Sequence, residues 1–339
     1  MDSIKNLKEQ IRNAKKIAII GHVNSDVDCL ASIISLKKAI LNNSELFGDK
    51  NISLFADMDE IDELYEPILK NETFKEKIGD CDLAICVDCP TLERLGKYKA
   101  VFENSPITIS VDHHENCQNF ANFNFVYKCS SACEVLYIIF KALNLEVTND
   151  ILKMLYAGII TDTVNLTQGT VKVSSYKTVA EIAEKVNDMD ALNAIKDYFL
   201  KNRTKSNLIL LERAIKSMQF FLDDRLAIMK ITKDDLLESD GGQSDTLGIV
   251  NNAINIKGVD IAILFIKQDD GSYYASIRSK GGIDVSKIAE KLGGGGHENV
   301  AAFSHDSNLS ELKDELLSLC LDALENVSAE NETDSLFGD

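Results

Sequence analysis

The chain has 339 residues, 45% of them apolar, and a formal net charge of −18. This length is enough for two ordinary domains, each with a buried core. The acidic charge argues against a protein that coats long nucleic acid, because such binding depends on neutralising many phosphates. No run of about 18 apolar residues is present, so we expect no membrane-spanning helix. The charged opening segment predicts no signal peptide.

Eight cysteines are present, without the spacing of a disulfide framework. Reduced thiols and a cytoplasmic location are therefore expected. Cys86 and Cys89 form a CxxC pair, but a zinc site would need about four ligands, and no second CxxC or paired histidine lies nearby in the sequence. The pattern favours ordinary packing in or beside a strand over a zinc site.

Apolar runs of strand length alternate with segments of helical periodicity in the first half of the chain. Strands are predicted at 16–22, 52–56, 82–88 and 107–112, and helices at 28–41, 132–143 and 149–160. This alternation is typical of an α/β fold with a parallel sheet covered by helices on both faces.

A second, smaller α/β unit is predicted after a mostly helical segment at 171–215. Its strands are expected at 225–231, 259–266 and 272–279, and its helices at 245–255, 284–291 and 309–325. We therefore divide the chain into an N-terminal domain at 1–190, a connector at 191–209 and a C-terminal domain at 210–327. The acidic, polar tail at 328–339 is expected to be disordered.

Four short segments of the N-terminal domain carry the residues of chemical interest. They are GHVNSDVDCLAS at 21–32 (His22, Asp26, Asp28), VDCP at 87–90 (Asp88), VDHHE at 111–115 (Asp112, His113, His114) and AGIITDT at 157–163 (Asp162). The first three follow directly from predicted strands. Because ligands of an open parallel sheet gather beyond the carboxyl ends of its strands, we expect these side chains to converge on one edge.

Convergence would bring together four carboxylates, from Asp26, Asp28, Asp88 and Asp162. Without counter-charge they would repel one another and partly protonate. Two divalent cations would cancel the four charges, and carboxylates with imidazoles suit manganese, iron or cobalt. Two such ions about 3.5–4 Å apart can activate water and stabilise in-line attack at phosphorus.

Each segment alone also has a purely structural interpretation. Asp26 and Asp28 could form a cap or turn, Asp88 an Asx turn before Pro90, and Asp162 a turn cap. The run of four glycines before His297 could be a flexible turn. The combination favours function, because four of the five histidines lie in these segments or directly after the glycine run.

The order of these motifs resembles the DHH phosphoesterase superfamily: HxxxDxD, an aspartate-ended strand, VDHHE and then GIITDT. The segment SIRSKGGIDVSKIAEKLGGGGHENVAAF at 276–303 resembles the DHH-associated substrate domain of the RecJ and nanoRNase (NrnA-like) branch. The resemblance spans roughly 16–325.

The resemblance implies a role for each matching residue. It assigns His22 and Asp26 to one metal, Asp28, His113 and Asp162 to the other, and Asp88 to both. Asp112 would support the adjacent histidines, and His114 would contact the substrate phosphate. In the C-terminal domain, Arg278 and the loop formed by Gly293, Gly294, Gly295, Gly296 and His297 would hold the substrate, since arginine grips phosphate with a planar fork and glycines let backbone amides approach it.

Four positions depart from the usual family pattern. Ser25 and Val27 stand where the first motif has proline and glycine in PDGD, Val164 where glycine commonly follows DT, and Phe303 where AAG ends in glycine. The predicted ligands are retained, so the departures affect the substrate assignment more than the metal assignment.

The function implied by the resemblance is two-metal hydrolysis of phosphate esters, with manganese favoured and magnesium or cobalt as alternatives. The implied substrates are short oligoribonucleotides, adenosine 3′,5′-bisphosphate, and linear or cyclic dinucleotides, over which the C-terminal domain is expected to close. The alternatives are a pyrophosphatase or polyphosphatase, and a nucleotide sensor or inactive scaffold without turnover. The sequence does not indicate the oligomeric state, and a homodimer is among the alternatives.

Overall fold

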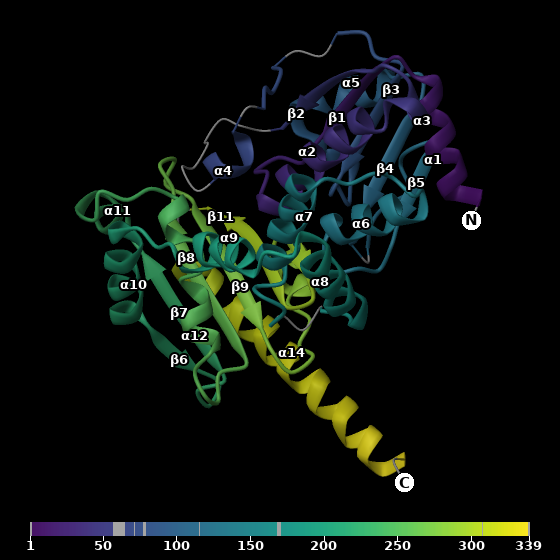
Figure 1. The fold of residues 1–339 in the computed structure, drawn as a ribbon. Coiled ribbons are helices and arrows are strands. Elements are labelled where there is room, and N and C mark those ends of the chain that lie inside the picture. Colours follow the sequence, from purple (N-terminus) through teal and green to yellow (C-terminus); the bar gives the residue numbers. More distant parts are fainter. Residues whose placement is uncertain are drawn as a thin grey trace. The chain divides into compact units, whose positions relative to one another are not determined.

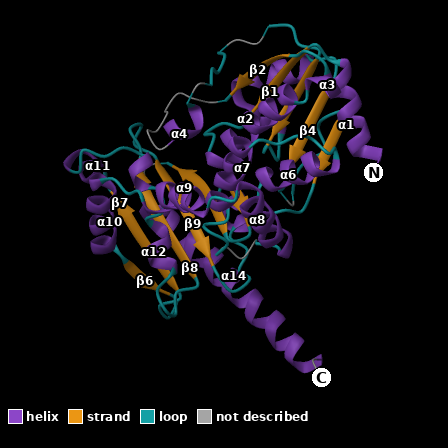
Figure 2. Ribbon diagram, viewed as in Figure 1, coloured by secondary structure: helices purple, strands orange, loops and turns teal. Residues whose placement is uncertain are grey.

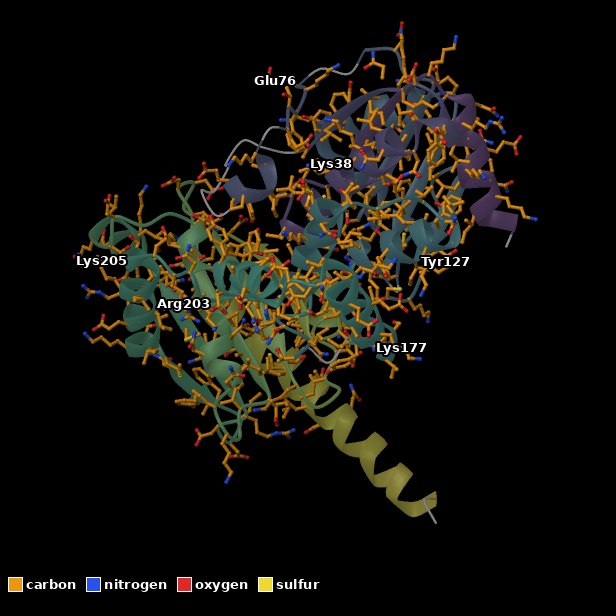
Figure 3. All side chains as sticks on the ribbon, viewed as in Figure 1. Lys38, Glu76, Tyr127, Lys177, Arg203 and Lys205 are labelled. Carbon is orange, nitrogen blue, oxygen red and sulfur yellow. The ribbon has the colours of Figure 1, made fainter. Side chains whose placement is uncertain are left out.

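The structure, a computed structural model, describes residues 2–56, 65–70, 72–76, 79–114, 116–167, 171–306 and 308–337, and the side chains of 2–3, 297 and 327–337 lie outside this description. The chain divides into two compact units, Met1–Asn202 and Arg203–Asp339, each with its own sheet (Figure 1). Arg203 and Lys205, labelled in Figure 3, lie at the start of the second unit. The division falls inside the stretch expected to be a connector, which consists largely of helix.

The first unit contains five strands and the helices that cover them. The strands are β1 (Lys16–Ile20), β2 (Asn51–Phe55), β3 (Leu83–Val87), β4 (Thr108–Asp112) and β5 (Phe123–Val126). The helices are α1 (Asp2–Asn13), α2 (Val27–Asn42), α3 (Ser44–Phe47), α4 (Glu66–Leu69), the 3₁₀ segment η2 (Leu92–Tyr98), α5 (Lys99–Asn104), α6 (Ala132–Ala142), α7 (Asn149–Asp162), α8 (Val173–Val186) and α9 (Met189–Lys201).

All strand pairs of the first sheet are parallel, in the order β2-β1-β3-β4-β5. The chain leaves β1 to form β2 on one side and then returns to form β3 on the other side of β1. The direction of strand order therefore reverses between β1 and β3. In open parallel sheets such a switch point opens a crevice at the carboxyl ends of the strands, where ligands bind.

Both faces of this sheet are buried. Ile17 and Ile19 of β1 belong to the large core shared with α2, α6 and α7, while Ala18 and Ile20 face a smaller core with η2 and α5. Strand β3 is accordingly apolar at every position, and β1 at every position except Lys16, as expected for a sheet covered on two sides. Figure 2 shows the helices around the sheet. The predicted fold class is confirmed.

The second unit is built on a six-stranded mixed sheet in the order β10-β11-β9-β8-β7-β6, in which only the β7–β8 pair is parallel. The strands are β6 (Gln219–Phe221), β7 (Leu226–Ile231), β8 (Ile261–Lys267), β9 (Tyr273–Ser279), β10 (Gly295–His297) and β11 (Val300–His305). The helices are α10 (Lys205–Ser217), α11 (Lys233–Glu238), the 3₁₀ turn η3 (Ser244–Thr246), α12 (Val250–Ile254), α13 (Ser286–Lys291) and α14 (Leu309–Phe337).

Two expectations for this unit differ from the structure. The helix predicted at 245–255 is shortened to α12, because Gly248 adopts a left-handed conformation with φ of 74° between η3 and the helix. Residues 328–337, expected to be disordered, continue α14 to Phe337. Within the described residues, none of the helices combines the length and apolar composition needed to cross a bilayer.

Candidate metal centre

Three neighbouring strands of the first sheet lead into the residues predicted to bind metal. His22 lies two residues after β1, Asp88 directly follows β3, and His113 directly follows β4. Because these strands are parallel neighbours, their carboxyl ends bring the three side chains to one edge, at the switch point. Asp88 has a left-handed backbone with φ of 63°, which is uncommon for a residue other than glycine.

Asp88 lies between two imidazoles. Its Oδ2 is 3.4 Å from Nε2 of His22, and its Oδ1 is 3.2 Å from Nε2 of His113. All three side chains are buried, and Asp88 Oδ1 accepts no hydrogen bond from a described residue. Burial alone would raise the pKa of Asp88, but the two imidazoles hold this pKa well below its ordinary value. Asp88 is thus an ionised carboxylate whose two oxygens face different ring nitrogens.

Asp28, His113 and Asp162 form a second group, in which one ligand atom from each residue lies within 4.8 Å of the other two. His113 Nε2 is 3.8 Å from Asp162 Oδ2. Burial and the charge of Asp88 raise the pKa of Asp28 to about 7. Burial and the charges of the neighbouring carboxylates also raise the pKa of Asp162. Carboxylates crowded in this way fit a site for divalent cations, which would neutralise them.

The Asp28 carboxylate is held by the start of α6. Its oxygens accept hydrogen bonds from the backbone N–H groups of Ala132 (2.6 Å) and Cys133 (3.0 Å). Gly158 of α7 packs against this contact, since a β-carbon there would clash with Cys133 Sγ and lie 2.6 Å from Asp28 Oδ1. Helix α6 and a glycine on α7 therefore position a predicted metal ligand.

Asp112 positions His114. The Asp112 carboxylate is fully buried, and its Oδ1 accepts hydrogen bonds from the backbone N–H of His114 (2.6 Å) and from Nδ1 of the same residue (3.0 Å). Donation by Nδ1 sets the tautomer, so Nε2 on the other side of the neutral ring is the acceptor. His114 Nδ1 is also 3.7 Å from Asp88 Oδ1.

Asp26 lies at the margin of the centre. Its Oδ1 accepts a hydrogen bond from the N–H of Cys29 (2.9 Å) and thereby caps α2. The side chain is 55% exposed, and its Oδ1 is 3.9 Å from His22 Nε2. Five of the six predicted ligands fall into tight groups of candidate metal donors among the described residues, and Asp26 does not.

Two buried side chains were missed from the sequence. Cys29 lies with His22 and Asp88 in a third group of candidate donors. Glu134 of α6 is fully buried, and its Oε2 accepts hydrogen bonds from Ser130 N (3.0 Å) and from Ser175 Oγ of α8 (2.7 Å). The spacing Ser131-x-x-Glu134 is a helix-start signal that could have marked Glu134, whereas Cys29 carries no local signal.

In the second unit, Arg278 lies on β9 and the glycine run leads into β10. Arg278 Nη1 donates to Ser276 Oγ (3.1 Å) and to the carbonyl of Ile277 (2.9 Å), while its buried Nε has no partner among the described residues. A β-carbon at Gly294 or Gly296 would clash with the backbone of β11, so these two glycines are required for packing. The side chain of His297 lies outside the description.

Two of the departures from the usual family pattern are core residues. Val27 begins α2 and is 6% exposed. Phe303 is 2% exposed, and its ring centroid is 6.1 Å from that of Phe265. Val164 lies in the turn that follows Asp162, where it adopts a left-handed conformation with φ of 46°. Glycine would suit that conformation without strain.

The fold and these groups define an α/β protein with a carboxylate–imidazole centre at the switch point of a parallel sheet. Residues 16–159 match the DHH family, N-terminal domain, and residues 223–326 match the DHHA1 domain. The chain belongs to the DHH superfamily and resembles its NrnA-like branch.

Curated relatives and a solved structure are similar to most of this chain. A membrane protein–large ribosomal subunit bL9 fusion protein of Aster yellows witches'-broom phytoplasma is 26% identical over 88% of the chain, which spans only 36% of that relative. The probable bifunctional oligoribonuclease and PAP phosphatase NrnA of Streptococcus mutans is 25% identical, with 93% and 97% of the two chains covered. An exopolyphosphatase-related protein from Bacteroides fragilis shares the fold, with a TM-score of 0.78, 21% identity and 96% of each chain covered.

Proposed function

We propose that the chain is a phosphoesterase that uses two divalent cations to hydrolyse short oligonucleotides or small nucleotide phosphates. The observation that carries this proposal is the position of Asp88, whose two oxygens lie within 3.4 Å of different imidazole nitrogens. A carboxylate shared in this way favours two ions at short separation, as in many phosphatases and nucleases. His22 and Asp26 would hold one ion, and Asp28, His113 and Asp162 the other.

The protein's own groups suit hard divalent cations. Four carboxylates supply four negative charges, and the imidazoles complete the donor set without adding charge. Oxygen and imidazole donors favour manganese, with magnesium and cobalt as alternatives. When bound, such ions activate water for attack and stabilise negative charge on the phosphoryl oxygens.

Other residues of the first unit would position the substrate. Asp112 holds His114 through two hydrogen bonds, so that Nε2 lies on the ring edge away from this carboxylate. We assign to His114 a contact with the substrate phosphate. A side chain already fixed by a buried carboxylate loses little conformational freedom when it binds, which favours orientation of the phosphate.

The second unit would supply substrate choice rather than the chemistry. All predicted metal ligands lie before residue 165, whereas Arg278 and the glycine run lie after 275. Arg278 Nε is buried and has no hydrogen-bond partner among the described residues, so the guanidinium keeps one unused donor. A single phosphate grip in a chain of net charge −18 favours a short, terminal substrate over a long strand. Similarity to a probable oligoribonuclease and PAP phosphatase supports this substrate class.

The test is a comparison of kcat/KM, with manganese added, across dinucleotides, longer oligonucleotides, adenosine 3′,5′-bisphosphate, cyclic dinucleotides, pyrophosphate and polyphosphate. We expect turnover of small nucleotides, with rates that fall as oligonucleotide length grows. Preference for pyrophosphate or polyphosphate would replace the proposed substrate class. Tight nucleotide binding without turnover of any substrate would indicate a sensor.

A further inference from the structure

The thiol of Cys29 lies inside the candidate metal centre. Cys29 is fully buried in the first turn of α2, and its Sγ accepts a hydrogen bond from the backbone N–H of His22 (3.3 Å). The sulfur atom, a ring nitrogen of His22 and a carboxylate oxygen of Asp88 all lie within 4.8 Å of one another. The centre therefore offers one sulfur, one nitrogen and one oxygen donor around a single point.

Packing confines the thiol to this place. A β-carbon at Gly21 would lie 2.6 Å from Cys29 Sγ, so the sulfur occupies the space that a side chain at position 21 would take. Asp88 Oδ1 is buried without a hydrogen-bond partner among the described residues, so this oxygen keeps a lone pair that can bind a cation. The three side chains are between 0% and 4% exposed, which excludes most competing water.

We propose that His22, Cys29 and Asp88 form a site for a thiophilic divalent cation, Zn²⁺ or Cd²⁺, that overlaps the site of the activating ion. Thiolate, imidazole and carboxylate are all ligands of zinc, and thiolate selects zinc-like cations over manganese or magnesium. On binding, the thiol releases its proton to solvent and its sulfur forms a bond to the cation, in which no group is oxidised or reduced.

The overlap predicts inhibition. His22 and Asp88 are shared with the proposed two-metal centre, so the inhibitory part of this inference rests on the proposed function. A cation bound to Cys29 would also occupy His22 and Asp88, so these two side chains could no longer bind the activating ion. Zinc binding and loss of manganese-dependent turnover would then occur together, which is not expected of a site made of oxygen and nitrogen donors alone.

The binding test uses the full-length protein freed of metal and titrated with Cd²⁺, following the sulfur-to-cadmium charge-transfer absorption in the ultraviolet. We expect one such band in the parent protein and its loss in Cys29→Ala and Cys29→Ser. The serine variant keeps the size of the side chain, so it covers the case in which the alanine variant fails to fold. Cys320→Ala, which removes a buried thiol of the second unit, should keep the band.

Two further variants separate this site from the neighbouring CxxC pair. Cys86→Ala and Cys89→Ala should keep the cadmium band, whereas loss of the band only in these variants would assign it to the pair and overturn the proposal. A band of equal intensity in folded Cys29→Ser would also overturn it. This readout does not depend on turnover, so it remains decisive if the proposed function fails.

Inhibition by zinc tests the overlap. In assays with manganese, the Zn²⁺ concentration that halves each variant's own activity should rise by at least about tenfold in Cys29→Ser relative to Cys320→Ala, because one of three protein ligands is lost. An unchanged value would show that zinc inhibits through the oxygen and imidazole donors alone.

Discussion

The carboxylate of Asp28 accepts a hydrogen bond of 2.6 Å from the backbone N–H of Ala132, 104 residues away in the chain. This contact joins the first turn of α2 to the first turn of α6, with a second bond from Cys133 N. The positive end of a helix favours a carboxylate at this place. A predicted metal ligand therefore also ties two helices of the first unit together.

Asp28→Asn should make the stability of the metal-free protein less sensitive to pH. Burial and the neighbouring Asp88 raise the folded-state pKa of Asp28 to about 7. A raised carboxyl pKa lowers the free energy of unfolding as the pH rises from about 4 to about 7, and a neutral asparagine removes this loss. Urea unfolding in the presence of chelator, at about pH 5 and about pH 7, would measure it. Asp26→Asn is the matched control, because Asp26 is 55% exposed and an asparagine can still cap α2. The same pH dependence in both variants would contradict the effect assigned to Asp28.

Gly158→Ala should destabilise the first unit by about 1–3 kcal/mol through overpacking. The added methyl group would meet Cys133 Sγ and Asp28 Oδ1. Combining it with Cys133→Ala should cost less than the sum of the two single changes, because the sulfur is removed. At Gly242 a β-carbon meets nothing within 4 Å, so Gly242→Ala serves as the control. Additive costs in the double variant would show that the strain arises elsewhere.

Val164→Gly should stabilise the protein by about 1 kcal/mol. Val164 has φ of 46°, and a β-branched residue in the left-handed region is strained by about 1–2 kcal/mol. Part of that gain is offset by the larger conformational freedom of glycine in the unfolded chain. Val173→Gly, at the first position of α8, should instead destabilise. Thermal unfolding of both variants decides this, and a lower melting temperature for Val164→Gly would refute the strain.

Arg278→Ala should lower kcat/KM for dinucleotides by about 10–100-fold, because a charged bidentate contact with phosphate is lost. Hydrolysis of bis-p-nitrophenyl phosphate, which makes little use of that contact, should change much less. Lys287→Ala removes an exposed cation of the same unit and should leave both substrates unaffected. An equal loss on both substrates, in folded protein that still binds metal, would assign Arg278 to the fold or the reaction centre.

The sequence was sufficient to predict the long, buried elements of the fold. Strands β1, β3 and β8 are apolar at nearly every position, which leaves little ambiguity. Strand β10 was not predicted, because its Gly295-Gly296-His297 sequence weakens a strand signal and forms one only by pairing with β11. Strand β6 is three residues long, too short for a periodic pattern.

The residues of the candidate centre that directly follow strands could be predicted from the sequence. Asp88 and His113 come directly after β3 and β4, so the parallel sheet brings them together. Cys29 could not be recognised, because a cysteine on the apolar side of a helix gives no sign of what it faces. The marginal position of Asp26 was also hidden, since helix capping and metal binding both favour aspartate there.

The variant Asp88→Asn tests whether Asp88 joins two metal ions in one site. The measurement is the number of manganese ions bound per chain, by equilibrium dialysis with elemental analysis, together with kcat on a dinucleotide. We predict two ions in the parent protein, at most one in the variant, and loss of turnover by at least about a thousandfold, because the ions lose their shared ligand. A variant that binds two ions and retains near-normal kcat would contradict it.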